Sequence, residues 1–147
     1  MSVKRKKKAA EEEPEEKPWY KFWPPSVRKH VDYPEVPLFE FLISSAQKYP
    51  DKTAMIYFDR KMTYKVLDML TDKFAAALAD LGVKKGDKVA IFLPNLPQFV
   101  ISYYGALKAG AIVTAISPLY REREIEYQLN DSEAETIVVL DLLYPIV

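Results

Sequence analysis

The stretch from residue 84 to residue 114, KKGDKVAIFLPNLPQFVISYYGALKAGAIVT, decides the fold. Residues 88–93 form a short, mostly apolar run, which is typical of a parallel strand covered on both faces. Asn95 is a suitable N-cap for a following helix, and Pro97 is tolerated in the first helical turn. The start of the stretch therefore predicts a buried strand that leads into a helix.

The second half of this stretch completes a strand–helix–strand unit. Gly110 ends the helix and residues 111–114 begin a second strand. Such a unit is almost always a right-handed crossover between parallel strands. The helix is marked by apolar residues at helical spacing, namely Phe99, Tyr103, Ala106 and Leu107.

Upstream, residues 38–49 predict a helix, with Phe39, Leu42, Ile43 and Ala46 turned inward. Residues 53–58 predict a strand, which turns at residues 59–61 and pairs back through Met62 and Thr63. Thr63 is then placed to cap a long helix, and Gly82 follows the end of that helix where a left-handed residue is needed. The apolar stripe of this helix comprises Leu67, Leu70, Phe74, Leu78 and Leu81.

Downstream, residues 117–120 predict a loop and residues 136–140 a third buried strand. The helix between them has Ile125 and Leu129 as its apolar positions, and Asn130–Ser132 end it. Asp141 is a candidate cap for one more helix, of which the chain holds only the first turn. The alternation predicts an α/β fold: a three-layer parallel sheet of βαβαβ type with an N-terminal helix and hairpin.

The N-terminal residues differ from the rest. Residues 1–17 join a basic run, Lys4 to Lys8, to an acidic run, and we expect a disordered charged tail. Residues 18–37 alternate aromatic residues with prolines, which favours an extended arm that packs through its aromatic side chains. Residues 38–147 are expected to form the folded part.

Composition excludes several classes of protein. The chain has no cysteine, so it holds no disulfide framework, which fits a cytoplasmic protein. Its 21 basic and 21 acidic residues cancel, so charge gives no general attraction to nucleic acid. No apolar run approaches the ~20 residues that span a bilayer.

Few residues suit catalysis. His30 is the sole histidine and lies in the arm, so neither a zinc site nor a Ser-His-Asp triad is expected. Gly105 and Gly110 have phosphate-loop spacing, but Gly105 falls within a predicted helix and no Lys-Ser/Thr pair follows. Arg121 and Arg123 follow a loop at the carboxyl end of a parallel strand, where α/β sheets place ligands. The alternating glutamates Glu122, Glu124 and Glu126 do not share a helix face, and a solvated face is expected.

Several short motifs, in order and at family-like spacing, occur between residues 50 and 132. They are MTY at 62–64, LGVKKGDKVA at 81–90, LPNLP at 93–97, LKAGA at 107–111, SPLY at 117–120 and LNDS at 129–132. This set resembles the N-terminal part of the acyl-adenylate-forming enzymes, which include AMP-binding acyl-CoA synthetases, and within them it is most similar to fatty-acid–CoA ligases. The expected fold is therefore an incomplete fragment of a larger adenylate-forming fold.

The resemblance implies an ATP-dependent acid–CoA ligase, with ATP, Mg²⁺ and CoA as its cofactors and a small-molecule carboxylate as substrate. The phosphate loop and the catalytic lysine of that family do not occur in this sequence. We therefore expect no catalytic residue and no metal ligand here, and no activity or tight cofactor binding by this chain alone. Its expected partner is the remainder of the synthetase, missing or on another chain. By resemblance, Ser117, Pro118 and Leu119 are candidate contacts on the CoA side.

Two alternatives remain open at this point. A non-enzymatic α/β binding or interaction module would use the half-sheet to dock a partner. A nucleic-acid binder would use Lys4 to Lys8, and its affinity would fall steeply with salt.

Overall fold

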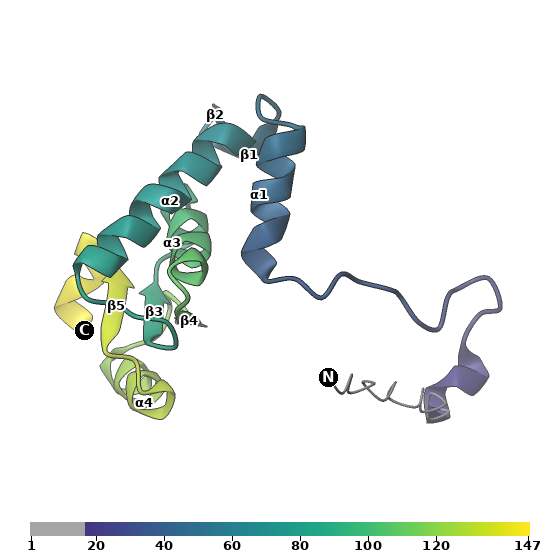
Figure 1. Ribbon diagram of the computed structural model, residues 1–147. Helices are drawn as coiled ribbons and strands as arrows, with labels where there is room; N and C mark the ends of the chain where they lie inside the picture. Colours follow the sequence, from purple (N-terminus) through teal and green to yellow (C-terminus); the bar gives the residue numbers. More distant parts are fainter. Residues whose placement is uncertain (1–16) are drawn as a thin grey trace, which may run out of the picture. The chain divides into compact units, whose positions relative to one another are not determined.

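The computed structural model describes residues 17–147 (Figure 1). They belong to two units, and the division falls between Glu35 and Val36. The charged tail predicted for residues 1–17 lies outside the described residues, apart from Lys17, and so does the basic run from Lys4 to Lys8.

The arm begins with a short 3-10 helix, η1 (Pro18–Phe22), which corrects the expectation of extended backbone there. Proline fits the first position of a helix because its missing N–H would have no partner, so Pro18 starts the turn. The ring of Tyr20 makes edge contacts with Trp23 at 5.9 Å and with His30 at 5.7 Å between centroids. The histidine thus takes part in an aromatic cluster of the arm.

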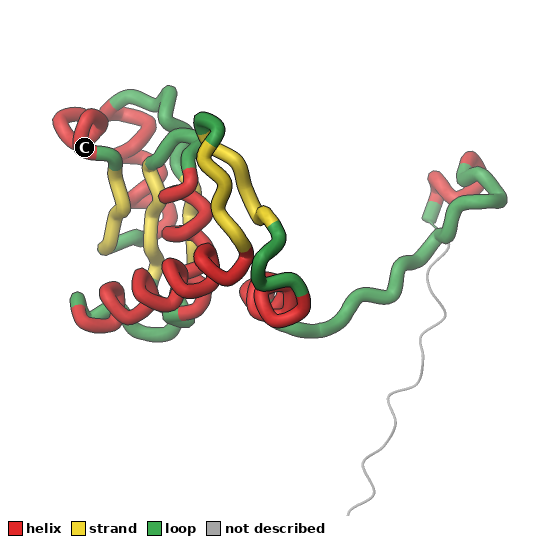
Figure 2. The backbone as a smooth tube through the Cα atoms, turned by 90° about the horizontal axis from the view of Figure 1, so that it is seen from above, coloured by secondary structure: helices red, strands yellow, loops and turns green. Residues whose placement is uncertain are grey.

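The core of the larger unit is a three-stranded parallel sheet. Its central strand is β3 (Lys88–Phe92), flanked by β4 (Ile112–Ala115) and β5 (Thr136–Val139) in the order β4-β3-β5 (Figures 1 and 2). In this register Ala90 lies opposite Thr114 on one side and Ile137 on the other. The predicted α/β fold with a parallel sheet is confirmed.

Helices cover both faces of the sheet. The helices α2 (Tyr64–Asp80) and α3 (Pro97–Lys108) pack on one face, where Val89 joins Leu78 and Ala106 in a buried cluster. On the other face, α4 (Glu122–Ser132) and the short 3-10 helix η2 (Asp141–Ile146) cover Phe92. Alternate residues of β3 therefore feed two separate cores, and the residues from Val89 to Phe92 are completely buried.

The helices α2 and α3 lie side by side, and two features set how closely they approach (Figure 1). A Cβ added at Gly105 of α3 would lie 2.8 Å from Cδ1 of Phe74, so only glycine fits there without a shift. Three residues later, Lys108 Nζ lies 2.6 Å from carboxylate oxygens of both Asp68 and Asp72 of α2. The two ion pairs of Lys108 with Asp68 and Asp72, called the clamp below, thus lie beside a tight apolar contact.

The remaining helix, α1 (Leu38–Lys48), packs on α2 and α3 through Leu42 and Ala46, both buried as predicted. It is followed by an antiparallel hairpin, β1 (Thr53–Tyr57) and β2 (Arg60–Thr63). The turn is Phe58-Asp59, both with positive φ (45° and 61°). Residues 60 and 61, predicted as part of the turn, belong to β2, because two left-handed residues suffice to reverse a hairpin.

Helix ends follow the predicted chemistry in some places and depart from it in others. Thr63 caps α2, since its Oγ1 accepts a hydrogen bond from Val66 N at 3.3 Å, and Gly82 follows the helix at φ 94°. Asn95 is not the cap of α3; Leu96 takes that position without a side-chain bond. Leu81 was expected to face inward but is 79% exposed, because α2 ends at Asp80 and the chain turns there.

The carboxyl end of α4 is tied to the start of β3. Glu133 adopts a left-handed conformation, at φ 53°, as the C-cap of α4. Lys88 Nζ donates a hydrogen bond to Glu133 Oε2 at 2.7 Å. This bond lowers the pKa of Glu133 and raises the pKa of Lys88.

The clamp at Lys108 gives a stability prediction. Lys108→Met keeps the length of the buried stem but leaves two carboxylates without their cation, and it is expected to lower the free energy of unfolding by about 1–2 kcal/mol. The control is Lys73→Met, on the exposed surface of α2, which should change the stability by less than about 0.5 kcal/mol. Equal effects in urea unfolding would show that the clamp contributes nothing specific.

The same clamp predicts a pH dependence. Burial lowers the pKa of Lys108, but the hydrogen bonds with Asp68 and Asp72 outweigh it, so the pKa is raised above its usual 10.5. A raised folded-state pKa means that the contribution is complete below pH 10.5 and is lost as the pH rises through the raised value. The stability difference between wild type and Lys108→Met should therefore be constant at neutral pH and shrink above pH 10.5. A difference that was already lost at neutral pH would contradict this.

Candidate functional site

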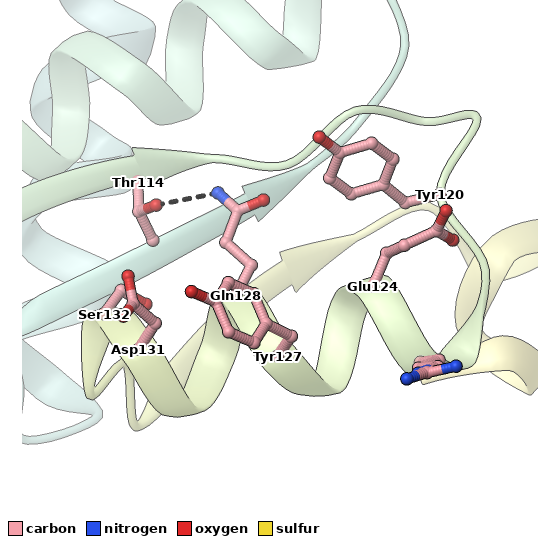
Figure 3. Close-up of a pocket in the computed structure, with 8 residues that line it drawn as sticks. Thr114, Tyr120, Glu124, Tyr127, Gln128, Asp131 and Ser132 are labelled. Carbon is pink, nitrogen blue, oxygen red and sulfur yellow. Dashed lines mark hydrogen bonds between the residues drawn. The ribbon is translucent and has the colours of Figure 1, made fainter.

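A surface pocket of about 890 Å³ lies where β4, the loop after it and α4 meet (Figure 3). One end of the pocket, at Tyr120, lies on the loop that leaves the carboxyl end of a parallel strand, where α/β sheets bind ligands. The pocket is open, and each of its lining residues carries a polar group. Its lining residues are Thr114, Tyr120, Arg123, Glu124, Tyr127, Gln128, Asp131 and Ser132.

Most of the pocket is one face of α4. Lining residues recur there three or four positions apart, at 123/124, 127/128 and 131/132, so their side chains project to one side. The other side of the helix carries Ile125, which is 1% exposed, and Leu129, and both pack on the sheet. Sequence reasoning found the apolar face but interpreted the polar face as solvated, and so it missed Tyr127, Gln128 and Asp131.

Gln128 holds the wall of the pocket in place. Its Nε2 donates to Thr114 Oγ1 at 3.0 Å and to the backbone oxygen of Ala115 at 2.9 Å. Figure 3 shows Gln128 reaching from α4 to Thr114, with the ring of Tyr120 on the loop side of the same space. Because these two hydrogen bonds join Gln128 of α4 to the edge strand β4, they fix the distance between the helix and the strand.

The predicted contacts Ser117, Pro118 and Leu119 form a turn between two lining residues, Thr114 and Tyr120. Tyr120 N donates to Ser117 O at 3.0 Å, and Leu119 N approaches Ser117 Oγ at 3.4 Å. The hydroxyl of Ser117 is therefore used within the turn, and the side chain of Leu119 is 85% exposed. The turn adjoins the pocket in sequence, but none of the three residues lines it.

One of the two arginines at the start of α4, Arg123, lines the pocket. The backbone N of Arg121 donates to Glu124 Oε2 at 2.7 Å, so this carboxylate caps the first turn of the helix. Arg123 lines the pocket and makes no ion pair with any residue of the part of the chain that is described. Glu122 and Glu126 are exposed, as the predicted solvated face requires.

The charged side chains of this pocket are one arginine and two carboxylates, Arg123, Glu124 and Asp131. None of its lining residues is a histidine, cysteine or lysine, and Arg123 is its one cation. Arg123 can pair with a phosphate, while the partly exposed rings of Tyr120 and Tyr127 offer flat surfaces for a base.

The described residues offer few groups that would bind ATP or Mg²⁺. Among residues 17–147 there is no group of three histidine, cysteine or carboxylate side chains that would hold a metal ion. Gly105 lies inside α3, as predicted, so its spacing to Gly110 forms no phosphate loop. No step through a metal ion is therefore assigned to these residues.

Of the helices described, none has the length and apolar character to cross a membrane.

A family model described as AMP-binding enzyme matches residues 42–145 of the chain. A long-chain-fatty-acid–CoA ligase of Bacillus subtilis is 47% identical over 132 residues, which are 88% of this chain and 23% of the relative. A long-chain-fatty-acid–CoA ligase of Yersinia pestis is 41% identical over 127 residues, which are 85% of this chain and 23% of the relative. The chain thus spans about a quarter of the length of these relatives.

Comparison with solved structures gives the same result as the comparison with these relatives. A long-chain-fatty-acid–CoA ligase from Archaeoglobus fulgidus superposes with a TM-score of 0.75 at 32% identity, covering 80% of this chain and 25% of the other. An anthranilate–CoA ligase in complex with anthranoyl-AMP gives a TM-score of 0.73 at 28% identity, covering 76% and 22%. With a family match over most of the sequence, the chain belongs to the AMP-binding enzymes.

Proposed function

We propose that this chain is part of an ATP-dependent acid–CoA ligase that acts on long-chain fatty acids. The observation that carries the proposal is the 47% identity with the Bacillus subtilis ligase over nearly the whole chain. In the proposed reaction, a carboxylate oxygen attacks the α-phosphorus of ATP, pyrophosphate leaves, and an acyl-adenylate forms. The sulfur of CoA then attacks the acyl carbon and AMP leaves.

Within that reaction, we assign this chain a role in holding CoA. The turn at Ser117–Leu119, given by resemblance as the CoA side, adjoins a pocket that offers one unpaired arginine and two exposed tyrosine rings. Arg123 would pair with a phosphate of CoA, and Tyr120 would stack on its adenine. The residues that activate ATP are expected outside this chain, so the chain alone should be inactive.

A chimera tests the proposed function. The matching segment of the Bacillus subtilis ligase is replaced with residues 36–147 of this chain. We expect the chimera to catalyse both fatty-acid-dependent exchange of pyrophosphate into ATP and acyl-CoA formation, whereas the 147-residue chain alone does neither. Clear turnover by the chain alone would contradict the assigned division of labour. A chimera that folds, by circular dichroism and gel filtration, but does not activate fatty acids would contradict the family function.

The CoA role has its own test in the same chimera. Arg123→Gln removes a charge-assisted contact and is expected to raise KM for CoA about fivefold. Pyrophosphate exchange, which needs no CoA, should not change. The matched control is Lys84→Gln, an exposed cation outside the pocket, which should leave both steps unchanged. If the substitution raised KM for ATP and left KM for CoA unchanged, Arg123 would contact ATP and the proposed contact with CoA would be wrong.

A further inference from the structure

The aromatic arm belongs to a unit of its own, and two side-chain hydrogen bonds fold it back on itself after η1 (Figure 1). Trp23 Nε1 donates to the backbone oxygen of Val27 at 3.1 Å. The hydroxyl of Tyr20 donates to the backbone oxygen of Lys29 at 3.4 Å. The arm therefore has a defined local structure, although η1 at its start contains no buried residue.

The large apolar side chains of the arm find little cover within it. The ring of Phe22 is 80% exposed, and that of Trp19 is 56% exposed. Val31 and Tyr33, farther along, are exposed as well. An apolar surface of this kind marks a place where a second apolar phase or a partner binds.

The charge of the arm has one sign next to these rings. From residue 17 to residue 31 the sequence has four lysines or arginines and no aspartate or glutamate. The Nζ atoms of Lys21 and Lys29 each lie over an aromatic ring of the arm, 4.9 Å and 5.0 Å from the ring centroids. Arg28 is exposed, and none of these three cations makes an ion pair with a residue of the described part of the chain. Positive charge and apolar surface therefore occur side by side.

We propose that the arm binds the surface of a membrane that contains anionic lipids. Phe22 and Trp19 enter the boundary between headgroups and acyl chains, where aromatic rings are favoured. The cations Lys21, Arg28 and Lys29 stay at the level of the headgroups and pair with lipid phosphates. The arm lies on the membrane and does not cross it, and its binding does not rest on the proposed ligase reaction.

The ring contacts favour a lipid surface over a single strand of nucleic acid. Bases bind such proteins by stacking on the faces of aromatic rings. In the arm, Lys21 covers one face of Phe22 and Lys29 covers one face of Tyr20. A lysine over a ring is instead suited to a membrane surface, because its stem packs on apolar groups while its ammonium reaches the headgroups.

The test uses the intrinsic fluorescence of the full 147-residue chain, whose two tryptophans, Trp19 and Trp23, both lie in the arm. Vesicles of phosphatidylcholine and phosphatidylglycerol in equal amounts should shift the emission to shorter wavelength with a saturable dependence on lipid. Bromine on the acyl chains should quench the shifted emission. Vesicles of phosphatidylcholine alone should bind at least about tenfold more weakly, because they lack net negative charge.

Two triple variants with the same loss of charge separate the arm from the rest of the chain. The first replaces the three cations of the arm: Lys21→Gln, Arg28→Gln and Lys29→Gln. Its control replaces three exposed cations of the larger unit: Lys73→Gln, Lys84→Gln and Lys85→Gln. We expect the first to weaken binding to the mixed vesicles at least about tenfold, and the control to leave it unchanged.

The apolar contact has a matched pair of its own. Phe22→Ser should weaken binding to the mixed vesicles, because it removes the most exposed ring of the arm next to the cations. Phe58→Ser removes a ring of the larger unit that is 84% exposed, and it should leave binding unchanged. Both side chains are exposed, so neither change should lower the melting temperature.

Several results would overturn the proposal. One is the absence of an emission shift with the mixed vesicles, and another is equal binding to phosphatidylcholine alone. Equal losses in the two triple variants would reduce the effect to general charge attraction. A shift with polyuridylate but not with vesicles would assign the arm to nucleic acid. Short-wavelength emission that depends on chain concentration and not on lipid would assign it to a second copy of the chain.

Discussion

The complete burial of β3 is the constraint on which the rest of this structure depends. A strand with no exposed residue from Val89 to Phe92 needs apolar cover on both faces and a paired neighbour on both edges. The helices α2 and α3 provide one cover, α4 and η2 provide the other, and β4 and β5 fill the edges. Because both flanking strands run parallel to β3, their carboxyl ends meet at one edge, and the loop that borders the α4 pocket starts there.

Much of this arrangement was predictable from the sequence, because burial on two faces leaves a continuous apolar run and helices covering a sheet leave a stripe at helical spacing. The strands β3, β4 and β5, the cap at Thr63 and the left-handed Gly82 all follow from such local signals. The family was identifiable as well, because short motifs in a fixed order are more specific than any one of them.

The predictions that the structure corrects failed for physical reasons that are not visible in the local sequence. Leu81 fits the apolar stripe of α2, yet the helix ends one residue before it. Asn95 is a good cap by residue type, but the chain enters α3 one residue later. The α4 pocket was missed because polar residues at helical spacing look the same whether they face open solvent or a hollow. Only the position of α4 beside β4, fixed by Gln128, separates the two cases.

The contact between Gly105 and Phe74 has a consequence for how sequence can change in this fold. A side chain at position 105 would collide with an aromatic ring on the neighbouring helix, so the two positions are not free to vary one at a time. A smaller residue at position 74 would remove the 2.8 Å contact, but the added Cβ would still lie 3.0 Å from the Cβ of Phe74 and from the backbone oxygen of Thr71. No substitution at position 74 alone therefore makes room for a side chain at 105. During divergence, glycine should be replaced there only if α2 and α3 also move apart, since any other replacement lowers the stability.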